Sequence, residues 1–343
     1  MTSKEQPRIE MRPFAAADFP AVRALYRKVW HGEARDERYD RMRFVETMDG
    51  VCPGVVAMDG ETCAGFYMIW PMTLCVGATL VPAGQSIDTM TSLDYQGQGI
   101  FTRLARATYE LAAQRGIQVL IGAPNAASYP GFMRRLSWAH PCEIITYVRP
   151  LSLSGAVPFG AALTPAARLL PLAGEAGVET REEAPAGEAL AAFLAAIPAE
   201  RGIWRVRRTA QWYAFRYQPA GKFDYRWVSV YRDGALAGLA IWGMPLAPDG
   251  RLVRANLVEL VGLDAAARRA AAAGAVRAAR AAGAHVIAAA TTSKPLAAPL
   301  RSNGFLRYRS GPLIARTLGP QSFDANPFGA GSWGLFGADF DFV

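Results

Sequence analysis

Hydrophobic positions along the first half of the chain change period several times. A spacing of three and four residues, which predicts an amphipathic helix, recurs between residues 15 and 30, at Phe19, Val22, Leu25, Tyr26 and Val29. Apolar runs around Asp59-Gly60 predict a hairpin over residues 55–70, because Asp-Gly favours a tight hairpin turn. The later elements are predicted as strands at 74–80 and 85–91, a helix at 99–115, a strand at 117–121, a short helix at 128–136 and a closing strand at 142–148. This alternation predicts an α/β domain with a mixed sheet.

The second half repeats this order of elements. A hairpin around Asp233-Gly234 is followed by a strand, a long Ala/Arg helix, a strand, a short helix and a final strand, at 257–261, 265–282, 285–290, 295–302 and 305–316. Between the halves, residues 150–187 are rich in Pro, Gly and Ala. We therefore predict domains at 1–150 and 186–343 with a linker at 151–185. The repeat indicates duplication, although two unrelated α/β domains can share such an order.

One stretch is long and apolar enough to raise the question of a membrane span. No charged residue lies between Glu61 and Asp88. Prolines and glycines interrupt the stretch and β-formers dominate it, which predicts buried strands. The charged segment 1–12 does not resemble a secretory signal. We expect a cytoplasmic protein with no membrane span.

Composition excludes some classes of protein and leaves others open. With 51% hydrophobic and 19% charged residues, the chain can bury a large core. The net charge is +8, and all but four of its 37 Lys and Arg residues are arginine; arginine favours phosphate-bearing partners, but a GC-rich coding sequence enriches it equally. The basic residues are dispersed, which argues against nucleic-acid binding. Four cysteines without a CxxC pair, and three histidines, predict no metal site.

The most informative segment joins the strand ending near Leu93 to the helix opening at Gly99. It reads Gln96-Gly97-Gln98-Gly99-Ile100-Phe101. Two glycines expose the backbone N–H groups of residues 96–99, and the helix N-terminus behind them favours an anion, so we predict a phosphate or pyrophosphate site. An ordinary strand-to-helix turn is the alternative. The segment has neither the Gly-Lys-Ser/Thr of a Walker loop nor the third glycine of a Rossmann turn.

This segment resembles the pyrophosphate motif of the GNAT acyltransferase superfamily, Arg/Gln-x-x-Gly-x-Gly/Ala. The match covers the first four positions, and Phe101 departs at the last, which bears on how tightly the pocket closes on its ligand. The order of elements over residues 8–149 supports the resemblance. It implies two tandem GNAT-like domains, of which the second is a degenerate copy, since Gly262 to Arg268 contains no paired glycines.

The resemblance also implies roles for individual residues. The strand before the turn would hold the pantetheine arm and the thioester through main-chain amides at Met90, Thr91 and Leu93, and residues 96–101 would hold the diphosphate. Asn125 would bond the arm, unless it is a plain loop cap. The tyrosine that many members use as a general acid is replaced by Met133; Tyr129, one turn earlier, is our candidate acid, unless it only packs at the helix start.

Further candidates come from isolated polar residues. Asp88, on an otherwise uncharged strand, is our candidate general base, with a structural hydrogen bond or an edge position as the alternative. Arg103 and Arg106 are candidates for CoA phosphates or for an exposed helix face. Asp339 and Asp341 lie in an aromatic C-terminal tail, which either enters an acceptor cleft or, more commonly, packs on the surface.

Taken together, the resemblance implies an enzyme, an N-acetyltransferase that moves an acetyl or other short acyl group from acyl-CoA to a primary amine in a ternary complex, without a metal. The acceptor is expected to be a small molecule, with an amino sugar of surface polysaccharide metabolism as one candidate; the aromatic residues Trp204, Trp212, Tyr213 and Tyr217 could line its site. A peptide or protein lysine is the alternative acceptor, and a non-catalytic acyl-CoA-binding module is the alternative from another class. We expect a monomer or homodimer.

Overall fold

The computed structural model describes residues 9–30, 36–48, 50–152, 165, 167, 169–173, 177–218, 223–245, 252–320 and 322–340. They divide into two compact units, neither of which is continuous in sequence. Unit 1 takes its described residues from Met1–Cys75, Thr79–Pro141 and Leu313–Phe328. Unit 2 takes them from Val76–Ala78, Cys142–Pro312 and Gly329–Val343.

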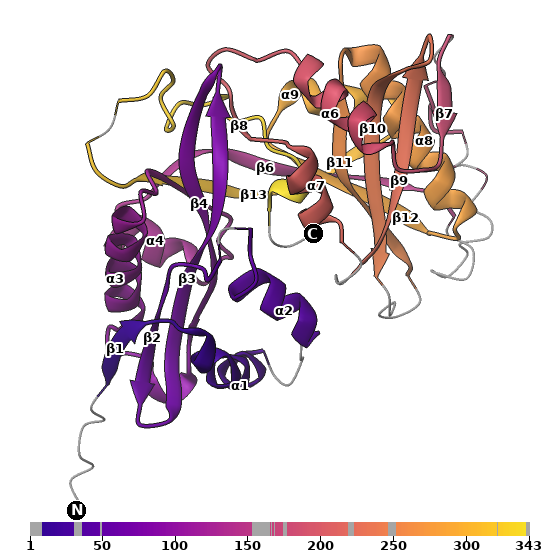
Figure 1. Cartoon of the computed structure of the whole chain (residues 1–343). Coiled ribbons are helices and arrows are strands. Elements are labelled where there is room, and N and C mark those ends of the chain that lie inside the picture. The colour runs from indigo at the N-terminus through magenta and orange to yellow at the C-terminus, as the bar shows by residue number, and fades with distance from the viewer. Residues whose placement is uncertain are drawn as a thin grey trace, which may run out of the picture. The chain divides into compact units, whose positions relative to one another are not determined.

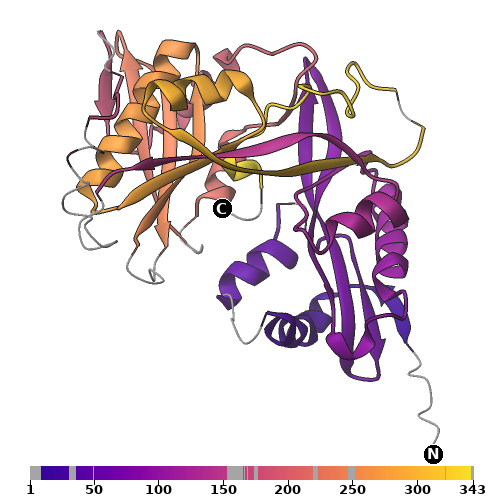
Figure 2. The same ribbon diagram turned by 180° about the vertical axis from the view of Figure 1, so that it is seen from behind.

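Unit 1 is a mixed sheet covered on both faces. Its strands follow the order β1-β2-β3-β4-β5-β13, with bounds Glu10–Pro13, Gly54–Asp59, Thr62–Val76, Thr79–Thr91, Val119–Gly122 and, for the strand that enters from unit 2, Leu306–Thr317. Strands β4 and β5 are parallel. Helices α1 (Phe19–Val29) and α2 (Glu37–Phe44) cover one face, and α3 (Ile100–Gln114) and α4 (Tyr129–Arg135) the other (Figures 1 and 2).

The uncharged stretch between Glu61 and Asp88 forms strands, as predicted, but the turn lies elsewhere. Strands β3 and β4 run through Pro71 and Pro82, and the chain reverses between Val76 and Thr79. Pro82 is tolerated within β4 because it precedes Ala83, the first residue in register with β5. Its carbonyl oxygen still accepts a hydrogen bond from Gln118 N at 2.9 Å. Among the described residues, none of the helices combines the length and the hydropathy that crossing a bilayer requires.

Unit 2 repeats the order seen in unit 1. Its sheet runs β6-β12-β11-β10-β9-β7, with bounds Ala139–Pro150, Val286–Thr291, Arg254–Gly262, Ala235–Pro245, Phe223–Arg232 and Glu179–Arg181. Strands β11 and β12 are parallel, like β4 and β5. The hydrophobic pattern missed the three-residue strands β7 and β8 (Trp204–Val206), which are too short to show a period of two.

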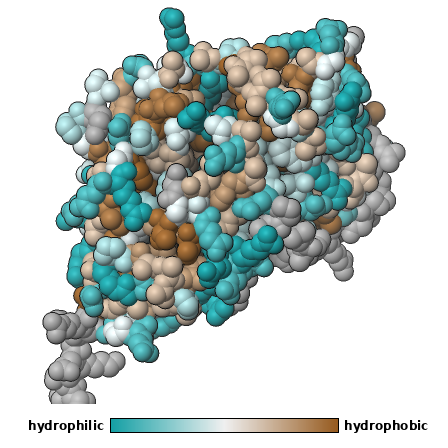
Figure 3. Space-filling view, in the orientation of Figure 1, coloured by the Kyte–Doolittle hydropathy of each residue, from teal (hydrophilic) through white to brown (hydrophobic). Residues whose placement is uncertain are grey.

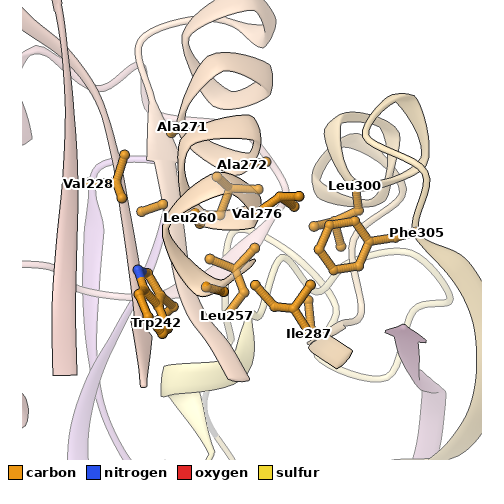
Figure 4. Close-up of a cluster of buried hydrophobic side chains, with 14 of the residues drawn as sticks. Val228, Trp242, Leu257, Leu260, Ala271, Ala272, Val276, Ile287, Leu300 and Phe305 are labelled. Carbon is orange, nitrogen blue, oxygen red and sulfur yellow. The ribbon is translucent and has the colours of Figure 1, made fainter. Parts of the chain in front are cut away.

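Helices also cover both faces of the unit 2 sheet. Helices α6 (Gly187–Ala196) and α7 (Ala210–Arg216) pack on one face, and α8 (Ala265–Ala281) and α9 (Lys294–Ser302) on the other. Figure 4 shows the α8 side, where Ala271, Ala272 and Val276 meet β-strand residues such as Leu257. At Gly274 a Cβ atom would lie 2.5 Å from Val228 Cγ1, so small residues allow this helix to approach the sheet closely. On the face in Figure 3, hydrophobic residues are scattered among hydrophilic ones, as on most protein surfaces.

The closing strand of each half of the sequence lies in the sheet that the other half builds. Strand β6, which ends the first half, pairs with β12 from Val286↔Pro150 to Thr291↔Ile145. Strand β13, which ends the second half, pairs with β5 from Ile314↔Gly122 to Thr317↔Val119. Strands at both positions were predicted, but a local pattern does not specify which distant strand each one joins. The domain boundaries at 150 and 185 remain predictions about which parts of the chain fold on their own.

Candidate functional site

The turn before α3 is held in place from both sides. Its 3₁₀ segment Leu93–Tyr95 begins at Ser92, whose N–H donates to Ala64 O at 2.9 Å. Asp94 pairs with Lys28 at the end of α1, and the Tyr95 hydroxyl donates to the Asp59 carboxylate at 2.8 Å. That hydrogen bond raises the pKa of Tyr95. The turn is therefore fixed at its start, while residues 96–99 are exposed.

Both glycines of the turn have a left-handed backbone. The φ angles are 78° at Gly97 and 72° at Gly99, a region that favours glycine. Apart from the residues next to each glycine in the chain, a Cβ atom on either residue would meet no heavy atom within 4 Å. Gly99 is the N-cap of α3, whose first turn holds no acidic residue. The N–H groups of a helix's first turn have no intrahelical acceptor, so an anion can approach them here.

Strands β4 and β5 part next to this turn. Their registered pairs run from Ala83↔Val119 to Ser86↔Gly122, and β4 then continues to Thr91. We call the place beyond Ser86 and Gly122, where the register between the two strands ends, the first strand opening. Met90 on this extension is buried, Thr91 half-buried and Leu93 exposed. Met90 and Thr91, two of the three residues expected to hold an extended ligand, thus lie on the part of β4 that is no longer in register with β5, and Leu93 opens the 3₁₀ segment that follows.

A buried hydrogen-bonded group of side chains lies below the first strand opening. Tyr67 shares one hydrogen bond with Ser86 at 2.7 Å and another with Tyr109 at 3.2 Å. The Trp138 indole donates to the Tyr109 hydroxyl at 2.9 Å. Burial raises the pKa of Tyr67 and of Tyr109, so both phenols stay neutral and can donate a hydrogen bond. This group holds Ser86, the last residue of β4 in register with β5, in position.

Asn125 acts as a local cap in this structure. Its side-chain oxygen accepts from Ala127 N at 3.1 Å and from Ser128 N and Oγ at 2.9 and 3.0 Å. It stands three residues after Gly122, the last paired residue of β5. The residue therefore lies at the first strand opening, with its oxygen engaged in its own loop.

Tyr129 begins α4 and contacts a histidine, His140, from the start of β6. The phenol oxygen of Tyr129 lies 3.1 Å from Nδ1 of His140. Phe101, which departs from the motif, packs edge-on against Phe132 of α4 with ring centroids 5.5 Å apart. A Cβ atom on Gly131 would lie 2.8 Å from the Phe101 ring. Phe101 thus joins α3 to α4, and this contact accounts for a large side chain at that position.

Asp88 forms a buried ion pair. Its Oδ2 lies 3.0 Å from Nη2 of Arg43 on α2, and the two side chains are only 9% and 2% exposed. Asp88 also adopts a φ of 46°, unusual for a non-glycine residue. Sequence reasoning missed Arg43, and its position beside Phe44 on the apolar side of α2 was the only signal for it.

Other candidates fall outside the turn and the first strand opening. Arg103 and Arg106 are exposed on the first turns of α3. Trp204, Tyr213 and Tyr217 are buried in unit 2, so they pack the core there. The expectation of a surface-packed tail is wrong for residues 333–340, because Trp333, Leu335, Phe336, Asp339 and Phe340 are at most 3% exposed. Asp341 lies outside the described residues, and the part of the chain that is described contains no cluster of His, Cys, Asp or Glu suited to a metal ion.

Comparison with known proteins agrees with this arrangement. Residues 10–140 match the family model of the acetyltransferase (GNAT) domain. A probable N-acyltransferase from Enterococcus faecalis V583 shares the fold with a TM-score of 0.66 and 14% identity, over 90% of this chain and 73% of that one. A tandem GNAT protein from the clavulanic acid biosynthesis pathway is similar with a TM-score of 0.58 and 15% identity, over 92% of this chain and 100% of that one.

A third structure extends the likeness to a longer acyl donor. The Saccharomyces cerevisiae N-myristoyltransferase, solved with bound myristoyl-CoA, is similar with a TM-score of 0.63 and 12% identity, over 96% of this chain and 86% of that one. No functionally curated protein matches the chain in sequence. At these identities the solved structures establish the fold alone.

Proposed function

Because the chain carries a GNAT acetyltransferase domain in residues 10–140, we propose that this protein transfers an acyl group from acyl-CoA, most simply acetyl-CoA, to a primary amine of a small molecule. The GNAT acyltransferase fold supports acyl transfer from acyl-CoA. The observation that carries the proposal is the exposed turn at residues 96–99, where two left-handed glycines open directly into α3.

The turn supplies the donors that a diphosphate needs. The Gln96 N–H already donates to Leu93 O at 3.3 Å, so the proposed donors are the N–H groups from Gly97 to Phe101, and the α3 dipole adds partial positive charge. Arg103 and Arg106 project from the same end of the helix and are exposed, so they can pair with further phosphate oxygens of CoA.

The extension of β4 would place the thioester. An extended pantetheine arm in the first strand opening can accept and donate hydrogen bonds along Met90 and Thr91 of β4 and Leu93 just after it. The side-chain amide nitrogen of Asn125 can donate from the other side, since its oxygen accepts within its own loop. An amide aimed at the thioester carbonyl would stabilise the oxyanion that forms as the amine attacks. Transfer then proceeds directly between two bound substrates, so that proximity supplies much of the rate enhancement.

Proton transfer requires two groups. Tyr129 is the proposed acid for the departing thiolate; the adjacent His140, 3.1 Å away, can return the proton to the phenol. Asp88 is the proposed base, directly or through a water molecule, for the attacking amine. The Arg43 guanidinium keeps that carboxylate oriented on the strand.

The proposed acceptor is a primary amine on a small molecule. A small-molecule amine, with an amino sugar as one candidate, fits the resemblance to a tandem GNAT protein of a biosynthetic pathway. Acylation of a peptide or protein lysine is the alternative reaction. A module that binds acyl-CoA without catalysis is favoured by one observation, the loss of the usual tyrosine to Met133, which packs against the hydrophobic core of unit 1.

The test uses isotope-labelled acetyl-CoA with a panel of amino sugars, polyamines and lysine peptides. We expect label transfer to a small amine, and we expect Tyr129→Phe to lower kcat more than the affinity for CoA. His140→Gln should narrow the pH range of activity if it returns the proton to Tyr129. Binding of CoA without transfer to any amine would instead favour the module, and transfer to peptides alone would favour the lysine acceptor.

A further inference from the structure

Unit 2 contains a strand opening built like that of unit 1. The registered pairs of β11 and β12 run from Arg254↔Val286 to Leu257↔Ala289, and β11 then continues to Gly262. Strand β4 likewise continues from Ser86 to Thr91, five residues in each case. We call the place beyond Leu257 and Ala289 the second strand opening. By this register Glu259 corresponds to Asp88, and Thr292 to Asn125.

The C-terminal residues Trp333–Phe340, the tail segment, fill the second strand opening. On the β12 side, Thr291 Oγ1 donates to Leu335 O at 2.7 Å, and Thr292 N donates to the same oxygen at 3.1 Å. The Thr292 hydroxyl donates to Trp333 O at 2.8 Å and accepts from Leu335 N at 3.0 Å. An extended chain with amide groups is thus held by the position that corresponds to Asn125.

On the β11 side the tail segment lies against main chain and a buried ionic group. A Cβ atom on Gly337 would lie 3.1 Å from both Cα and O of Val258, so only a small residue fits. Asp339 pairs with Arg208, which also donates to Glu259 at 2.9 Å. Arg216 donates to the carbonyls of Ala338 and Phe340 at 3.2 and 3.4 Å. These contacts come from β11, from the segment before α7 and from α7 itself.

The N-terminus of α8, the helix that follows β11, is capped by a carboxylate of the protein itself. The N-cap of α8 is Asp264, whose carboxylate accepts from Ala267 N at 2.8 Å and from Arg232 at 2.7 Å. These hydrogen bonds lower the pKa of Asp264 to about 2, so it is ionised. A fixed anion therefore already stands at the α8 N-terminus, whereas the N-cap of α3 is Gly99, which has no side chain.

We propose that the acyl-CoA site of unit 2 is occupied by the protein's own chain. The tail segment lies in the second strand opening, where a pantetheine arm would run, and the Asp264 carboxylate lies where a diphosphate would bind. The identification of these places rests on the proposed function of unit 1. The chain then binds one acyl-CoA, in unit 1, and the tail segment is a fixed part of unit 2.

Hydrogen exchange of the wild-type full chain tests the tail segment without any CoA. The amides of Gly334, Leu335 and Phe336 should exchange as slowly as those of β11. Thr292→Val removes both hydroxyl contacts while keeping the shape, and should speed exchange at Leu335 about fivefold to tenfold, whereas Thr292→Ser should not. Fast exchange across the tail segment of the wild type, or no difference between the two variants, would overturn the proposal.

The number of CoA molecules bound per chain, measured by native mass spectrometry and calorimetry, completes the test. One CoA on the wild type, bound about 100-fold more weakly by Gly99→Val, supports the proposal. Two on the wild type, or one bound by Gly99→Val with unchanged affinity, overturns it. No binding by the wild type would refute the proposed function of unit 1, and the exchange experiment would then decide on the tail segment by itself.

Discussion

Helices α3 and α8 each follow the first strand of a parallel pair, β4 with β5 and β11 with β12, but their N-termini carry opposite kinds of N-cap. Helix α3 begins at Gly99 with an exposed corner and no acidic residue in its first turn. Helix α8 begins at Asp264, whose carboxylate bonds the first-turn amide of Ala267. The two N-termini thus differ at the N-cap: Asp264 places a carboxylate at the start of α8, whereas Gly99 places no side chain at the start of α3.

The largest effect is expected from breaking the ionic group that holds the tail segment. Arg208→Ala leaves the carboxylates of Glu259 and Asp339 buried without their guanidinium, which should lower the free energy of unfolding of unit 2 by about 3–5 kcal/mol. Calorimetric unfolding measures this. Arg181→Ala, at an exposed pair with Glu179, is the control and should change little. Equal effects of the two variants would contradict a structural role for Arg208.

Next in size is the loss of ligand at α3. Gly99→Val places a branched side chain in the corner and should weaken CoA binding about 100-fold, or 2.7 kcal/mol. Gly116→Val is the matched control, since Gly116 ends the same helix with a φ of 80° and an equally open Cβ position. Both variants carry the same kind of backbone strain, so calorimetric titration should separate strain from binding. Equal affinities would remove the diphosphate assignment.

A smaller effect is expected at α8. Asp264→Ala should cost about 1 kcal/mol of stability as a lost N-cap, and it should create no CoA binding because the tail segment still fills the second strand opening. The pKa of Asp264 is lowered to about 2 by its hydrogen bonds, so its contribution is present above its ordinary pKa and is lost as the pH falls through 2. Thermal unfolding of both proteins from pH 2 to pH 7 should therefore converge at the acid end.

The smallest effect concerns the pH dependence of unit 2. Burial and the neighbouring Asp339 carboxylate raise the pKa of Glu259, against the opposing effect of Arg208. A raised pKa in the folded state stabilises at low pH, and this contribution is lost as the pH rises through that pKa. Glu259→Gln should therefore gain stability relative to wild type as the pH rises from 4.5 to 8. A constant difference over this range would show that Glu259 does not titrate in the folded protein.

The sequence predicted those parts of the site that depend on residues close together in the chain. The glycine turn at 96–99 followed from residue types alone, because left-handed backbone favours glycine. Arg43 and His140 were not predicted as partners of Asp88 and Tyr129. Arg43 lies 45 positions before the carboxylate it pairs with, and no local pattern records such a contact.

What the sequence determined by itself was the order of the longer helices and strands and the place where α3 begins. Hydrophobic period and turn residues act within a few positions of one another, so they are readable along the chain. Only the tertiary structure decided that β6, from the first half of the sequence, pairs with β12, that β13, from the second half, pairs with β5, and that Leu335 lies beside Thr291. Those choices depend on hydrogen bonds between residues far apart in the chain, where many strands of equal hydrophobicity compete and packing selects one of them.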